Sequence, residues 1–236
     1  MEVVVVMCLV AAVLDGRAMG DLPPPHASYK ILMLLPASSM SHKNVLAPLA
    51  EGLAERGHEV VMLSCQRNIL HHPNITEIRY DPVRHDKPTT VASKFNYRNN
   101  LAGAFAQLKE ILPAVARELY KAPSVMQLYH RRKEFDLIIL DHMFNEMAYP
   151  FVHEVPFITV ATPGMDARQS AVLGNVLSPS YVPNLWKGYP LPLSLRHRLE
   201  NTAWHLFISF YWRWWAVVPR IQEEVRGHCT ALYRPV

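Results

Sequence analysis

The stretch from Ile31 to Ser64 reads ILMLLPASSMSHKNVLAPLAEGLAERGHEVVMLS and contains one strand–helix–strand unit. The continuous apolar run over residues 29–36 is typical of a strand that is buried on both faces of a parallel sheet. Apolar residues then recur at helical spacing until Gly57, which provides a C-terminal stop. Glu59 to Ser64 is a second buried strand. Since crossovers between parallel strands are right-handed, the unit predicts a parallel sheet covered by helices.

Pro48 affects where the helix of this unit is expected to begin. Proline has no backbone N–H and is tolerated in the first turn of a helix, where that N–H has no partner within the helix. We therefore predict that the helix begins near Val45 and that His42 lies before it.

Further apolar strands alternate with helical segments along the rest of the chain. We predict strands at 78–80, 135–140 and 156–161. We predict helices over 93–125 (interrupted by Pro113 and ending before Pro123), 146–153 and 195–225. The segment 162–192 is rich in Pro, Gly, Ser and Asn and is expected to be a long irregular loop. The alternation predicts an α/β fold with a Rossmann-like, doubly wound parallel sheet.

Composition and missing motifs exclude several classes of function. The chain has 236 residues, of which 50% are hydrophobic and 19% charged, as in an ordinary globular domain. Its net charge of +4 is scattered rather than gathered in a basic stripe, which argues against nucleic-acid binding. The loop after the first strand has no glycine-rich phosphate cradle, and the sequence has no P-loop, no CxxC pair, no GxSxG and no HExxH.

The N-terminus and one sequon indicate entry into the secretory pathway. The apolar run Val3–Leu14 is too short to span a bilayer and is followed by small residues at 18 and 20, so we predict a signal peptide over residues 1–20. Asn74-Ile75-Thr76 is a potential glycosylation site. Beyond the leader only Cys65 and Cys229 remain, and two cysteines do not indicate a disulfide framework. Whether they pair is open, with a free Cys65 favoured.

Two polar residues stand where an open α/β sheet binds its ligands. His42 follows the first strand and Asp141 closes the 135–140 strand. A carboxylate that binds one ring nitrogen of a histidine fixes its tautomer, and the other nitrogen can then accept a proton from a hydroxyl. A helix start beside His42 would favour the neutral ring. Spacing alone also allows the simpler interpretation of a helix cap and a turn residue.

The same segments resemble UDP-glycosyltransferases, and animal ones in particular. Residues 31–64 are similar to the opening of that family, with a loop that ends in Ser-His, a Pro-Leu in the helix and ERGHEV before the second strand. Residues 135–162, FDLIILDHMFNEMAYPFVHEVPFITVAT, are similar to its next diagnostic stretch. Residues 173–184, LGNVLSPSYVPN, resemble a loop typical of the invertebrate members.

The resemblance implies the N-terminal, acceptor-binding half of a GT-B glycosyltransferase, over residues 21–236. It makes His42 the catalytic base and Asp141 its partner, with Ser41 and Phe144 in contact with a small lipophilic acceptor. The implied reaction transfers a hexose from a UDP-sugar co-substrate with inversion, and it needs no metal and no further cofactor. The resemblance also implies a location in the endoplasmic reticulum lumen, a role in detoxification, and possible pairing with related transferases.

The family's UDP-binding signature and terminal membrane anchor are absent from the sequence. We therefore expect the chain to be inactive alone. An alternative is a non-catalytic product that binds lipophilic ligands or modulates full-length transferases, and another is an unrelated secreted α/β binding protein. The tail 203–218, AWHLFISFYWRWWAVV, has two interpretations, namely packing inside the protein or contact with a membrane surface.

Overall fold

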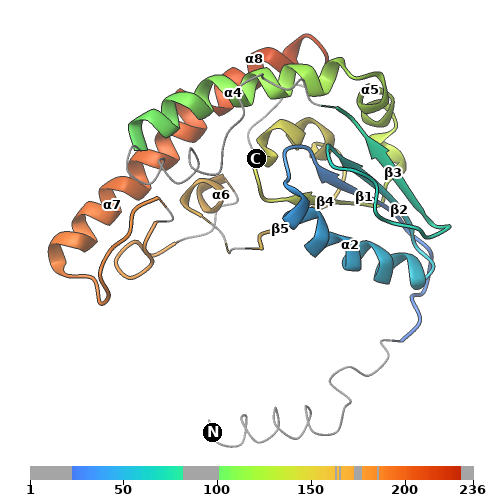
Figure 1. Cartoon of the computed structure of the whole chain (residues 1–236), viewed down its shortest axis with the longest axis horizontal. Coiled ribbons are helices and arrows are strands. Elements are labelled where there is room, and N and C mark those ends of the chain that lie inside the picture. The colour runs from blue at the N-terminus through green and yellow to red at the C-terminus, as the bar shows by residue number, and fades with distance from the viewer. Residues whose placement is uncertain are drawn as a thin grey trace, which may run out of the picture.

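A computed structural model describes residues 23–81, 101–162, 164, 166–172, 177–184 and 186–229. Five parallel strands form one sheet in the order β3-β2-β1-β4-β5 (Figure 1). The strands are β1 (Lys30–Leu35), β2 (Glu59–Ser64), β3 (Ile75–Arg79), β4 (Leu137–Asp141) and β5 (Phe157–Val160). This order confirms the predicted Rossmann-like, doubly wound α/β fold, since the chain winds in both directions from the central β1.

Helices cover both faces of the sheet because the central strands are apolar on both faces. Helix α2 (Met40–Glu55) packs on the face that carries Ile31, Met33 and Leu35. The opposite face, with Leu32 and Leu34, packs against the elements that follow β3 and β4. These elements are α4 (Leu101–Lys121), α5 (Pro123–His130) and the 3-10 helix η4 (Asn145–Val152), and α8 (Val218–Arg226) near the C-terminus joins the same core. A short 3-10 turn, η3 (Arg132–Glu134), follows α5.

Two predictions about prolines were wrong for the same reason. Helix α2 begins at Met40 rather than near Val45, so Pro48 lies in its interior. Helix α4 likewise continues through Pro113. Each helix buries one face, with Leu46 and Ala50 against the sheet in α2 and Leu112 in the core in α4. Packing of these faces outweighs the one hydrogen bond that each proline cannot donate.

Helix α5 is not among the predicted helices, because Pro123 favours the end of the preceding helix. The proline instead occupies the first turn of α5, where its missing N–H costs nothing. In the described part of the segment 162–192, which was expected to be irregular, residues Ala167–Val172 form the short helix α6. The expected helix over 146–153 is present as the 3-10 helix η4, all of whose residues are buried.

The aromatic tail is helical and only partly buried. Helix α7 (Leu195–Phe210) runs into a π-helical turn, η5 (Tyr211–Trp215), and then into α8, which lies side by side with α4 (Figure 1). Trp212 is fully buried, whereas Trp214 and Trp215 are more than 60% exposed. Packing inside the protein is therefore confirmed for Trp212, and contact of the tail with a membrane surface stays a prediction. Within the described ranges, no helix is long and apolar enough to cross a membrane.

Three remaining predictions concern the leader, the sequon and the cysteines. The predicted signal peptide, 1–20, lies outside the described residues. Asn74 is exposed at the turn before β3. Cys65 and Cys229 are both free thiols, the first partly buried and the second buried.

Candidate active site

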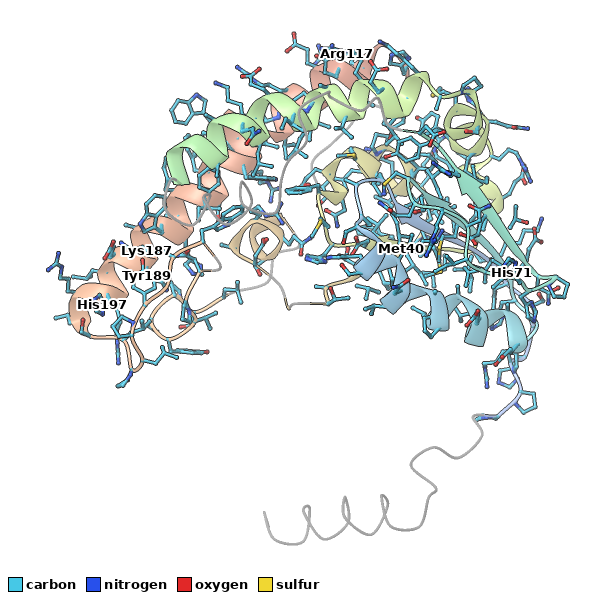
Figure 2. All side chains as sticks on the ribbon, viewed as in Figure 1. Met40, His71, Arg117, Lys187, Tyr189 and His197 are labelled. Carbon is cyan, nitrogen blue, oxygen red and sulfur yellow. The ribbon has the colours of Figure 1, made fainter. Side chains whose placement is uncertain are left out.

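The candidate site lies at the carboxyl end of the sheet, where β1 and β4 are neighbours. The chain leaves β1 through the turn at Pro36 and Ala37 and enters α2, while β4 ends at Asp141. From this point successive strands are added in opposite directions, which makes it the topological switch point of the sheet. Open α/β sheets bind their ligands at such a point. Figure 2 labels Met40, the first residue of α2, two residues before His42.

The structure brings His42 and Asp141 together across 99 residues of sequence. Nδ1 of His42 lies 2.9 Å from Oδ1 and 3.1 Å from Oδ2 of the carboxylate. Asp141 is fully buried, and the His42 side chain is 12% exposed. The hydroxyl of Ser38 donates a hydrogen bond to Oδ2 of Asp141. Because the carboxylate binds Nδ1, the Nε2 nitrogen is the one left for a ligand.

The surroundings of Asp141 favour its charged form. Burial raises its pKa, but the approach of His142 and the hydrogen bonds from Ser38 and His42 outweigh burial and hold the pKa below its ordinary value. The carboxylate is therefore ionised at neutral pH. A fixed negative charge beside Nδ1 can stabilise an imidazolium, so the pair is able to take a proton from a hydroxyl.

His42 lies inside the first turn of α2 and not in a loop before it, contrary to the sequence prediction. Ser39 is the extended N-cap residue, and its carbonyl accepts a backbone bond of 3.2 Å from Lys43. The positive end of the helix dipole thus lies at His42 itself, where it favours the neutral imidazole. A rigid turn, rather than a loop, sets the position of the imidazole.

His142 belongs to the same site and was missed by sequence reasoning. Its ring stacks on that of His42 with centroids 5.1 Å apart and an interplanar angle of 21°. Its Nδ1 lies 3.4 Å from Oδ1 of Asp141, and the residue is 5% exposed. The only signal in the sequence was its place directly after Asp141, which does not reveal that both side chains turn toward His42.

The two predicted acceptor contacts lie in different surroundings. Ser41 is exposed in the first turn of α2, with its hydroxyl 2.7 Å from that of Ser39. Phe144 has a left-handed backbone (φ 50°) and stacks on Trp212, with ring centroids 6.2 Å apart. Ser41 is thus open to a ligand beside His42, whereas Trp212 covers part of Phe144.

A buried ionic network lies next to the site and was also missed. The guanidinium of Arg168 binds the carboxylate of Asp166 at 2.7 Å and lies 3.6 Å from that of Glu146. Trp212 donates its indole N–H to Glu146, and its ring lies 4.5 Å from the Arg168 guanidinium. The amide of Gln169 donates to the backbone carbonyl of His142, which joins α6 to the end of β4.

The pKa values of the two acids of this network shift in opposite directions, although burial raises both. Burial raises the pKa of Glu146, and the charge of Arg168 offsets this only in part. Burial also raises the pKa of Asp166, but the charge and hydrogen bonds of Arg168 outweigh it, so that this pKa is lowered. Asp166 therefore pairs firmly with Arg168, whereas the charged form of Glu146 is less favoured than that of an ordinary glutamate.

The fold and the site together define a class: a doubly wound α/β domain with a histidine–carboxylate pair at its switch point. Comparison with known proteins narrows this class. The chain is 28% identical over 190 residues to "UDP-glycosyltransferase UGT5" of Dactylopius coccus, which covers 76% of this chain and 35% of that protein. It is 24% identical to "UDP-glucosyltransferase 2" over 77% of this chain, and 25% identical to "UDP-glycosyltransferase UGT4" over 80%, both of the same organism.

The chain is thus a relative of the UDP-glycosyltransferases, as its motifs indicated. It spans about a third of the length of these relatives, with 36% and 38% of the second and third covered. No protein-family model and no solved structure matches the chain.

Proposed function

We propose that this chain forms the acceptor-binding part of a UDP-glycosyltransferase and carries its catalytic base. The observation on which the proposal rests is the hydrogen bond between Nδ1 of His42 and the buried carboxylate of Asp141. That bond places the proton on Nδ1 and leaves a lone pair on Nε2. The names of the three relatives support the reaction class, because each is a UDP-glycosyltransferase or UDP-glucosyltransferase.

In the proposed reaction the acceptor is a small lipophilic molecule with a hydroxyl group. Nε2 of His42 takes the hydroxyl proton while the oxygen forms a bond to the anomeric carbon of a UDP-hexose. The bond from that carbon to the UDP oxygen breaks, and UDP leaves with the electron pair. Attack opposite the leaving group inverts the anomeric configuration. Asp141 stabilises the imidazolium that forms, and Ser41 lies beside His42 where the acceptor would bind.

The cellular setting belongs to the same proposal. A lumenal location is supported by the exposure of Asn74, which leaves its sequon open to glycosylation. Contact with a membrane surface is supported by the exposed aromatic and aliphatic side chains of α7 and η5. These are Leu199, Leu206, Phe207, Phe210, Trp214 and Trp215.

The test is the rate of UDP release from UDP-hexoses, with a panel of phenols and lipophilic alcohols, by a complete transferase that contains this chain, because the chain alone is expected to be inactive. We expect His42→Ala and Asp141→Asn each to lower kcat by about 10²- to 10⁴-fold, the usual contribution of a positioned general base. His71→Ala, at an exposed histidine far from the site, is the matched control and should retain the rate. Full activity in His42→Ala would refute the base.

A further inference from the structure

The candidate site also contains the donor set of a transition-metal site. One nitrogen of His42, one nitrogen of His142 and one carboxylate oxygen of Asp141 all lie within 4.8 Å of one another. Two imidazoles and a carboxylate suit zinc, copper, nickel and cobalt, whereas magnesium and calcium prefer oxygen ligands alone.

Hydrogen bonds within the site do not explain why the ring of His142 is buried there. It is 5% exposed, and its Nδ1 makes no hydrogen bond to the described residues, although it points at Asp141 from 3.4 Å. The contact with Asp141 is long, and a buried ring nitrogen with only one weak contact has lost its bonds to water without a full replacement, which is costly. A cation that binds this nitrogen would remove that cost.

The spacing of the three groups is close to what a small divalent ion needs. Ligand atoms about 2.0–2.2 Å from a tetrahedral zinc ion lie roughly 3.4 Å from one another. The separations between Asp141 and the two imidazole Nδ1 atoms are 2.9 Å and 3.4 Å. The two imidazole nitrogens would have to approach each other by no more than about 1.5 Å, and the rings would have to turn out of their present stack so that both nitrogens face one ion.

We propose that His42, Asp141 and His142 bind a zinc-class divalent cation, and that the bound ion inhibits the transferase. The ion would take the Nδ1 position of His42 that now faces the carboxylate. A neutral imidazole with a metal on Nδ1 carries its proton on Nε2, and such a nitrogen is a donor and cannot accept a proton. Metal binding therefore converts the proposed base into an inactive tautomer. Binding is independent of the proposed function, and only the inhibition rests on it.

Binding is tested directly by cobalt titration of the metal-free chain, purified without a histidine tag. Co²⁺ in a site with imidazole ligands gives visible d–d absorption, which reports on binding without any activity assay. We expect saturation at one Co²⁺ per chain and displacement by Zn²⁺. His142→Phe keeps a stacked ring but removes the nitrogen, and it should weaken binding more than about tenfold. The matched control is His71→Phe, at an exposed histidine away from Met40 and the start of α2 (Figure 2).

His42→Phe is a second variant in case the buried ring at 142 does not tolerate replacement, because the His42 side chain is partly exposed. Circular dichroism establishes that each variant is folded. The metal site is refuted if the wild-type chain takes up no Co²⁺ stoichiometrically, or if a folded His142→Phe or His42→Phe chain binds it as tightly as wild type. Tight binding with no effect on UDP release would leave the metal site standing and refute the inhibition.

Discussion

The buried ion pair between Lys43 and Glu77 gives the sharpest stability prediction. Lys43 is next to His42 in α2 and is fully buried, and its ammonium donates to the Glu77 carboxylate and, at 2.8 Å, to the carbonyl of Arg67. Glu77, in β3, also accepts backbone hydrogen bonds of 2.7 and 2.6 Å from Ile69 and Leu70. The pair thus ties the helix that carries His42 to the loop after β2.

Lys43→Met keeps the length of the side chain and removes the charge. The Glu77 carboxylate would then be buried with only its two backbone donors. Removing one partner of a buried ion pair typically costs about 3–5 kcal/mol. For a chain of this size that loss lowers Tm by roughly 6–20 °C, at about 2–4 °C for each kcal/mol.

The measurement is urea unfolding of the chain followed by circular dichroism, together with Tm. Lys30→Met is the matched control, because Lys30 forms an ion pair with Glu59 in which both side chains are about half exposed. That control should cost less than about 1 kcal/mol. In the double variant Lys43→Met with Glu77→Gln, the glutamine oxygen still accepts the backbone N–H groups and no charge is buried. We therefore expect the double variant to recover at least half of the loss.

Equal costs for Lys43→Met and Lys30→Met would refute the reasoning, since burial would then make no difference to the pair. A double variant less stable than Lys43→Met would also contradict it, because the loss would then not come from an uncompensated charge.

Two further predictions concern titratable groups. Because burial raises the pKa of Glu146, its contribution to stability is full below the unfolded-state pKa of about 4.3 and is lost as pH rises through the folded-state value. Urea unfolding from about pH 4 to 8 should show Glu146→Gln gaining stability relative to wild type as pH rises; a constant difference would contradict this. Burial raises the pKa of Cys229 to about 11, so at about pH 8 its alkylation by iodoacetamide should be more than about a hundredfold slower in the folded chain than in urea. Peptide mass spectrometry with Cys229→Ser as the control measures this, and equal rates in both states would disprove it.

The amino-acid sequence alone determined the sheet. Continuous apolar runs such as 31–35 and 59–64 have to be buried on both faces, and only a parallel sheet between two helical layers does that. The family motifs of residues 31–64 and 135–162 likewise identified the relatives and indicated His42 and Asp141.

Tertiary packing decided where helix α2 begins and where the side chains of the site lie, which local sequence patterns do not determine. Helix α2 begins at Met40 despite Pro48, because its buried face gains more from the sheet than the proline loses. The position of His142 and the contact of Trp212 with Glu146, 66 residues apart, depend on how β4, η4 and η5 meet. Hydrophobic periodicity and helix propensity depend only on residues that are close together in the sequence. Contacts between distant side chains arise only after the layers have packed, and the details of the site are therefore set by the tertiary structure.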